Sequence, residues 1–209
     1  MSSKNIDFFI KNSYVFVKNA LNKDIVKLIS DYALFDEIQN YCPDPDDQVV
    51  GVHSKYADPA MESMLIHLLP ILEKNTGLNL IPTYSFYRIY RNNSYLQKHK
   101  NKNACEISCS VSFNKNYSDE EYKWPFYIDG QELVLNPGDL VVYRGMEKEH
   151  WRNQLITQKD VWHIQGFFYY VDADGKNKNY AFDNRDFIGQ APSYRKGNLK
   201  KTYLKIGKS

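Results

Sequence analysis

The sequence contains no long apolar run, and no stretch approaches the roughly 18 apolar residues that can span a bilayer. The first residues, MSSKNIDFFIKN, also lack an apolar segment of signal-peptide length. We therefore expect no membrane partner for this chain and no secreted protein. With 10 glycines in 209 residues, a collagen-like chain is excluded as well.

Cysteine is scarce. The chain has only Cys42, Cys105 and Cys109, and no two of them form a CxxC pair. Such a set argues against a disulfide framework and offers too few thiolates for a cysteine-based zinc site. Cys105 and Cys109 lie in an apolar, strand-like run, which is typical of buried free thiols. Free thiols favour the cytosol, and we expect a cytoplasmic protein, in the host cytoplasm if the source is a virus.

An excess of charge of one sign is also missing, since 27 Lys and Arg face 25 Asp and Glu. A net charge of +2 argues against a dedicated nucleic-acid binder. Only the last stretch, RKGNLKKTYLKIGKS, is strongly basic, and we expect residues 197–209 to form a flexible tail. An alternative function as a basic-tailed interaction module would have only this basic stretch as its evidence.

Aromatic residues, in contrast, are abundant at 15% of the chain, including 17 Tyr. Aromatic and β-branched enrichment favours sheet. A chain of 209 residues fits one domain with a sizeable core. We expect that domain to cover residues 1–196, with helical support in residues 1–80.

Two helices are predicted in the first part of the chain. Residues 24–38 carry apolar side chains at helical spacing. Residues 59–75 are better marked, because Asp58 can cap the helix, Pro59 suits its first position and Gly77 suits its end. Pro70 lies inside this helix, so a kink or break is expected there.

From residue 81 onward the pattern changes to short strands. A first strand is predicted earlier, within residues 14–21; the later ones are expected at residues 83–91, 104–114, 125–128, 131–135, 139–145 and 161–171. Asp129-Gly130 predicts a two-residue hairpin turn, and residues 136–139 (NPGD) predict another turn. Six or seven strands after two helices indicate a β-sandwich or barrel braced by helices.

Three of the five histidines lie in this strand-rich part: His99, His150 and His163. A barrel can bring distant histidines together in its mouth, and a histidine pair with one carboxylate suits non-haem Fe(II). Spacing alone makes this a weak signal. His163 and Gln165 are two apart on a strand and are expected to face the same way.

The chain resembles the 2-oxoglutarate- and Fe(II)-dependent dioxygenases of the prolyl 4-hydroxylase-like branch, as found in phages and bacteria. The resemblance covers nearly all of residues 8–175 and is carried by four segments in family-like order: TYSFYRIYR, LQKHKNKNACEIS, NPGDLVVYRGMEKEHWR and FFYYVDADG. It implies a mainly β fold with N-terminal helices, a double-stranded β-helix of the cupin-like jelly-roll type. The jelly-roll itself is expected in residues 81–175.

The resemblance also implies an iron site built on an H-x-D…H triad. The two histidines map to His99 and His150, and the middle position maps to Asn101, an asparagine in place of the family's aspartate. An amide oxygen can still coordinate a metal, but it brings no negative charge, so a divalent cation should be held less tightly. The implied cofactors are Fe(II), 2-oxoglutarate and O2, with ascorbate as a further candidate.

In the family, a basic residue on the strand after the distal histidine binds the far carboxylate of 2-oxoglutarate. Counting forward from His150 reaches Lys159, whereas aligning the strand end FFYYVDAD places His163 there. We prefer His163, because strand register is a stronger constraint than loop length. The other candidates for contact with the cosubstrate are Tyr90, Arg144 and Arg152.

The resemblance implies an oxidoreductase that hydroxylates a peptidyl side chain such as proline, or a small molecule. The alternative is a non-catalytic or metal-weakened cupin-like binding protein that has lost its carboxylate ligand at residue 101.

Overall fold

The computed structural model describes residues 2–39, 44, 46–118, 120, 122–157 and 160–191. The helices are α1 (Ser2–Asn12), α2 (Lys23–Gln39) and α3 (Pro59–Thr76), with short 3-10 helices η1 (Asn103–Cys105) and η2 (Lys178–Asn184). The strands are β1 (Tyr14–Val17), β2 (His53–Tyr56), β3 (Leu80–Arg91), β4 (Leu96–His99), β5 (Ile107–Lys115), β6 (Phe126–Ile128), β7 (Gln131–Leu133), β8 (Leu140–Arg144), β9 (His150–Arg152) and β10 (Trp162–Asp172).

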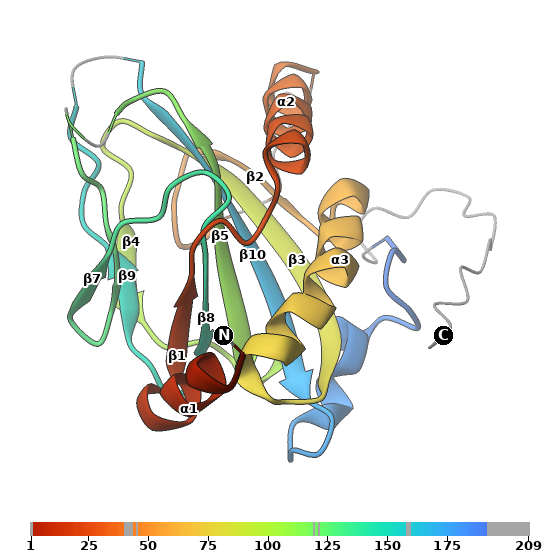
Figure 1. Ribbon diagram of the computed structural model, residues 1–209. Helices are drawn as coiled ribbons and strands as arrows, with labels where there is room; N and C mark the ends of the chain where they lie inside the picture. Colours follow the sequence, from red (N-terminus) through yellow and green to blue (C-terminus); the bar gives the residue numbers. More distant parts are fainter. Residues whose placement is uncertain are drawn as a thin grey trace.

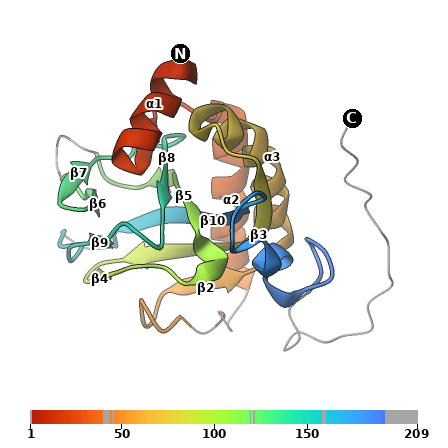
Figure 2. The same cartoon turned by 90° about the horizontal axis from the view of Figure 1, so that it is seen from below.

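The strands form two antiparallel sheets. The larger has the order β1-β8-β5-β10-β3-β2 and the smaller the order β4-β9-β6-β7. Helices α2 and α3 lie on the side of the larger sheet that faces away from β4 and β9 (Figures 1 and 2). The larger sheet is therefore the middle layer, with one apolar core against the helices and another between the sheets. This is a jelly-roll with N-terminal helices, so the expected fold class is confirmed.

Helix α3 begins and ends where its sequence signals predict. The Asp58 carboxylate accepts from the main-chain N–H groups of Ala60 and Met61, at 3.0 and 3.2 Å. Gly77 adopts φ 73° at the C-terminal end, a left-handed conformation that glycine tolerates without strain. Of the kink or break expected at Pro70, the break is wrong, since the helix runs on to Thr76; the kink stays a prediction.

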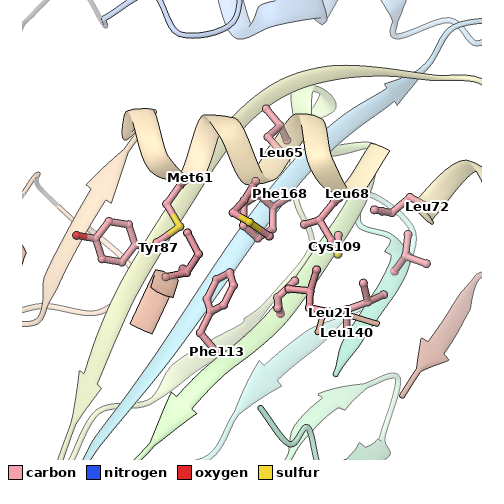
Figure 3. Packing of buried hydrophobic residues seen from close by; sticks show 14 of the residues in the cluster. Leu21, Met61, Leu65, Leu68, Leu72, Tyr87, Cys109, Phe113, Leu140 and Phe168 are labelled. Atoms are coloured by element: carbon pink, nitrogen blue, oxygen red, sulfur yellow. The ribbon is translucent and has the colours of Figure 1, made fainter. Parts of the chain in front are cut away.

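Packing explains why α3 continues past Pro70. Met61, Leu65, Leu68 and Leu72 follow one another at helical spacing along α3 and are almost fully buried. Figure 3 shows them lying over the larger sheet, so that both halves of the helix are held against one surface. The buried apolar area on either side of the proline outweighs the loss of one hydrogen bond.

Several elements differ from the prediction. Helix α1 was not expected, although its Phe9 is fully buried. Strand β2 was also not predicted; it pairs with β3, while β1 pairs with β8 at the other edge of the larger sheet. The short strands β4 and β9 were not expected either. The hairpin at Asp129-Gly130 is confirmed, with both residues at positive φ.

The boundaries proposed for the domain, residues 1–196, remain a prediction. The basic tail at residues 197–209 lies outside the described residues. Among the helices that the structure describes, none is both long and apolar enough to cross a membrane.

Candidate metal and cosubstrate site

The short strands β4 and β9 bring two histidines together. His99 lies directly opposite His150 in the antiparallel register, and the two ring centres are 4.2 Å apart. The rings of Phe126 and Tyr143 surround His150, at 5.9 and 4.8 Å between ring centres. The structure thus has the two predicted rings in one place, while their role as metal ligands stays a prediction.

A bulge in β4 turns His99 inward. Leu96 pairs with Arg152 and His99 pairs with His150, so β4 has one residue more than β9 over this stretch. Residues three apart on a regular strand face opposite ways, but an inserted residue brings both to one face. Leu96 is buried in the core between the sheets, and the bulge lets His99 point into the same interior.

Main-chain carbonyls fix the orientation of both rings. The Nδ1–H of His99 donates to the Gln97 carbonyl at 2.7 Å, and that of His150 donates to the Lys148 carbonyl at 2.9 Å. With the proton on Nδ1, the Nε2 lone pair of each ring is available to a metal. A hydrogen bond from the distal ring nitrogen to a carbonyl is the usual support of a metal-binding histidine.

Both rings are neutral at physiological pH. Burial lowers the pKa of His150 to about 3, with a further contribution from the neighbouring His99. Burial also lowers the pKa of His99, and the charge of Arg88 acts in the same direction. Neutral imidazole is the form that binds metals, so no proton has to leave before a cation enters.

Asn101 lies beside the histidine pair. Its main-chain N–H donates to the Gly145 carbonyl at 2.9 Å, and its Nδ2 donates to Ser108 Oγ at 2.9 Å. Its side chain also interacts with His99 and with the Tyr143 hydroxyl. Among the described residues, no cluster of three His, Cys, Asp or Glu side chains could hold a metal ion. Asn101 is therefore the nearest candidate for a third ligand.

The two carboxylates closest in sequence are engaged elsewhere. Glu106 accepts from the main-chain N–H of Asp172 at 3.1 Å. Glu149 pairs with Lys98 at 2.8 Å, and both of these side chains are about half exposed. Neither takes the place of the missing aspartate in the structure.

His163 and Tyr90 face each other across β10 and β3, on the interior side of the larger sheet. Burial drives the pKa of His163 well below its usual range, and the charge of Arg152 lowers it further. The ring is therefore neutral, so His163 can act on a ligand through hydrogen bonds but brings no positive charge. Its Nε2–H donates to Gln165 Oε1 at 3.0 Å, which confirms that His163 and Gln165 face the same way.

Arg152 brings a positive charge into this interior. It lies two residues after His150 on β9, on the same face of the strand, and is 2% exposed. Its guanidinium donates to the Trp124 carbonyl at 2.6 Å and to Gln165 Oε1 at 2.8 Å, and it lies 4.3 Å from the centre of the Trp124 ring. Its Nε has no hydrogen-bond partner, and no carboxylate within the described ranges forms an ion pair with it.

Arg144, a further cosubstrate candidate, is not brought to this interior. Arg144 lies on the opposite face of the larger sheet from Tyr143, where its guanidinium sits 5.3 Å from the ring of Phe9 in α1. Alternation along β8 explains this, because neighbouring side chains point to opposite faces. Lys159 lies outside the described residues.

A cavity of about 420 Å³ adjoins His99 and Asn101. Aromatic side chains form much of its wall, and charged side chains of both signs complete it; its lining includes Tyr56, Tyr84, Phe86, Tyr169, Arg88, Lys100, Lys102 and Asp46. Arg88 is fully buried and forms an ion pair with Asp46 at 2.8 Å. Of the histidine pair, His99 lines this cavity.

No protein-family model and no curated protein matches the sequence. Solved structures do match. A prolyl-4-hydroxylase from Pseudomonas putida is 16% identical with a TM-score of 0.59, over 81% of this chain and 98% of that one. The fold is that of the 2-oxoglutarate- and Fe(II)-dependent oxygenases.

Two further oxygenases match over more of the chain. SnoN, a non-heme alpha-ketoglutarate-dependent epimerase from nogalamycin biosynthesis, has a TM-score of 0.70 at 12% identity, over 99% of this chain and 96% of that one. A 2OG-Fe(II) oxygenase family member from Burkholderia pseudomallei has a TM-score of 0.63 at 12% identity, over 88% and 93%. At such identities the likeness to these oxygenases establishes the fold, and the chemistry has to be argued from the site.

Sequence reasoning missed two residues of this oxygenase-like interior, Arg88 and Ser108, and one contact of Gln165. Arg88 follows Phe86 and precedes Tyr90 on the same face of β3, so alternation could have found it. Gln165 was expected to share a face with His163, but its contact with Arg152 was not foreseen. Ser108, the partner of Asn101, had no sequence signal, because a serine in an apolar strand is common.

Proposed function

We propose that the protein is a 2-oxoglutarate- and Fe(II)-dependent oxygenase that hydroxylates an acceptor, either a peptidyl side chain such as proline or a small molecule. One observation carries the proposal. Two histidines with available Nε2 atoms share an interior with Arg152, a buried guanidinium that has no carboxylate partner in the described part of the chain. Imidazole pairs suit a first-row metal and a guanidinium suits a carboxylate, and 2-oxoglutarate catalysis requires both.

The donor set fits a divalent metal. His99 and His150 would supply two nitrogens, and the amide oxygen of Asn101 would supply the third ligand. Fe(II), 2-oxoglutarate and O2 together supply the oxidation: one oxygen atom enters the acceptor and the other enters succinate, with loss of CO2. The part played by these residues would be to hold the metal beside the cavity that His99 and Asn101 line.

Arg152 would bind the far carboxylate of 2-oxoglutarate. Residues two apart on a strand lie about 6.6 Å apart, so a ligand held at His150 can reach Arg152 with a short carbon chain along the same face. Gln165 and His163 would keep the guanidinium oriented. Gln165 Oε1 accepts hydrogen bonds from the Arg152 guanidinium and from His163 Nε2. Tyr90 completes this wall, opposite His163 in the strand register.

The acceptor would enter through the 420 Å³ cavity. Tyr84, Phe86 and Tyr169 offer an apolar, aromatic surface next to His99. Arg88 is already neutralised by Asp46, so this side of the site does not demand a strongly charged acceptor. A proline-containing peptide and an uncharged small molecule both suit such a surface.

The second candidate is a cupin-like binding protein that has lost turnover. The observation in its favour is Asn101, because a neutral third ligand leaves the metal site more positive and weaker than a carboxylate would. Such a protein would bind 2-oxoglutarate or the acceptor without releasing succinate.

Succinate release separates the two candidates. Purified protein is incubated with Fe(II), 2-oxoglutarate and air, without an acceptor, and succinate is measured over time. The oxygenase proposal expects release above that of His150→Ala and of Arg152→Met. Release at the level of these two variants, alongside intact 2-oxoglutarate binding, would favour the binding protein.

A further inference from the structure

Asn101 is enclosed by a defined set of hydrogen bonds rather than left in open space. Its Nδ2 lies 2.9 Å from Ser108 Oγ. Ser108 Oγ in turn lies 2.9 Å from the Cys105 carbonyl, and Ser108 is fully buried. The main chain of Asn101 is held by the Gly145 carbonyl.

These contacts determine which way the amide faces. A hydroxyl has one hydrogen, and a carbonyl only accepts, so the hydrogen of Ser108 goes to Cys105. Ser108 Oγ can then only accept from residue 101, and a carboxamide meets that demand with its NH2 group. The amide oxygen of Asn101 is consequently the branch that points away from Ser108, and the Asn101 side chain also interacts with His99.

Gly145 provides the space for this arrangement. A side-chain carbon at residue 145 would lie 2.4 Å from Ser108 Oγ, 2.6 Å from the Cys105 carbonyl oxygen and 2.7 Å from Asn101 Nδ2. The three atoms form a hydrogen-bond relay, which runs from Asn101 Nδ2 through Ser108 Oγ to the Cys105 carbonyl oxygen. All of them occupy the space that a side chain at residue 145 would need. The relay is therefore a packed unit and not an accidental contact.

An aspartate at residue 101 would not fit this relay equally well. Its carboxylate has no hydrogen to give, so it would compete with the Cys105 carbonyl for the single hydrogen of Ser108. Ser108 Oγ would then face two acceptor oxygens, that of the Cys105 carbonyl and that of the carboxylate, and one of these two contacts would have no hydrogen between its oxygens. The surroundings of residue 101 thus match asparagine better than the aspartate that occupies this place in the resembling enzymes.

We propose that Ser108 is a positioning residue that presents the Asn101 amide oxygen to the metal, so that the site is built around a neutral third ligand. This inference rests on the proposed metal site. It differs from the view that Asn101 merely replaced a lost aspartate ligand, because that view does not require hydrogen bonds that orient the amide.

Metal affinity tests the inference without any acceptor or turnover. Ni²⁺ binding to metal-free protein is titrated by calorimetry for wild type, Ser108→Ala, Asn101→Asp and the double variant. Ser108→Ala should weaken Ni²⁺ binding about 2- to 10-fold when residue 101 is asparagine, which corresponds to one neutral hydrogen bond. In the Asn101→Asp background the same change should cause no loss, because either carboxylate orientation offers an oxygen.

Two controls make the result specific. Ser85→Ala removes another fully buried hydroxyl, which donates to Glu62 at 3.0 Å on the helix-facing side of β3, and should leave Ni²⁺ affinity unchanged. Melting of the metal-free proteins shows whether each variant is folded. If Ser108→Ala fails to fold, Ser108→Cys keeps the volume and replaces the hydroxyl with a weak acceptor.

Equal loss on Ser108→Ala in both backgrounds, or no loss in either, would overturn the positioning role. Failure of the metal site itself looks different. In that case His150→Ala would bind Ni²⁺ as well as the wild type does, whatever residue stands at position 108.

Discussion

Arg152 places a positive charge between the two sheets with no negative charge opposite it among the described residues. An uncompensated buried charge costs several kcal/mol. Two hydrogen bonds and the faces of Trp124 and Phe126, at 4.3 and 5.6 Å, offset part of that cost. The residue therefore makes better sense as half of a pair whose other half is a ligand carboxylate.

Replacing Arg152 by methionine should separate stability from binding. The variant removes an unpaired charge and keeps much of the volume, so its metal-free melting temperature should equal or exceed that of the wild type. The rise in melting temperature caused by 2-oxoglutarate with Ni²⁺ should disappear. A variant that melts lower but keeps its response to 2-oxoglutarate would assign Arg152 to the core alone. Tyr95→Ala, at an exposed residue, is the control.

At the scale of single elements, the Asp36 carboxylate of α2 contacts two strands of the larger sheet. Asp36 accepts from Lys55 at 2.6 Å and from the Tyr87 hydroxyl at 2.5 Å, and it lies 2.7 Å from His53 Nε2. Burial raises the pKa of Asp36, but hydrogen bonds from Lys55, Tyr87 and His53 outweigh it, and the net pKa is lowered. One side chain thus joins α2 to both β2 and β3.

Asp36→Asn should destabilise the fold in a pH-dependent way. A carboxylate with a lowered folded pKa contributes stability at neutral pH, and this contribution is lost as pH falls through that pKa. The variant should lose about 3 kcal/mol or more at pH 7, and the difference from wild type should shrink below about pH 4. Urea unfolding across pH measures this. Asp31→Asn, which breaks an exposed pair with Lys27, should change little at any pH; a constant gap for Asp36→Asn would refute its ionised role.

Elements with local signals could be predicted from the sequence, and those defined by distant partners could not. Asp58, Pro59 and Gly77 punctuate α3, and Asp129-Gly130 specifies its hairpin without reference to the rest of the chain. β4 and β9 have only 4 and 3 residues, and they are strands because they pair with each other. The sequence pointed to His99 and His150 through the resemblance alone, and it could not reveal the bulge that turns His99 inward.

The same reasoning explains the cosubstrate residues. His163 was preferred on register as the cosubstrate residue, and in the structure it lies opposite Tyr90. What sequence could not supply is the protonation state, because the pKa of a buried imidazole depends on the whole environment, including the charge of Arg152. The positive charge of Arg152 lies instead on β9, in the smaller sheet.

On the scale of the whole molecule, residues 178–191, which follow β10, contact helix α3 through an ion pair and hydrogen bonds. Arg185 forms a buried ion pair with Glu62 of α3 at 2.9 Å, with side chains 5% and 3% exposed. Glu62 also accepts from the main-chain N–H groups of Ser85 in β3 and of Gly189. One carboxylate thus joins α3, the larger sheet and the last described segment.

Arg185→Met should release this segment. It leaves the Glu62 charge buried without its partner, which favours local opening over the closed form. Tryptic cleavage after Lys178, followed by mass spectrometry, should be at least tenfold faster than in the wild type. Lys98→Met, which breaks an exposed pair with Glu149, should be cleaved at the wild-type rate. Unchanged cleavage of Arg185→Met would mean that other contacts hold the segment.

The opposed histidines have one more consequence for the molecule. They lie 51 residues apart in the chain, and β4, which carries one of them, is an edge strand of the smaller sheet. A metal held between them would act as a cross-link that closes this loop, and a closed loop of such length restricts the unfolded chain considerably. The bound ion would then contribute to the stability of the smaller sheet. Loss of iron would therefore destabilise the fold as well as stop the chemistry.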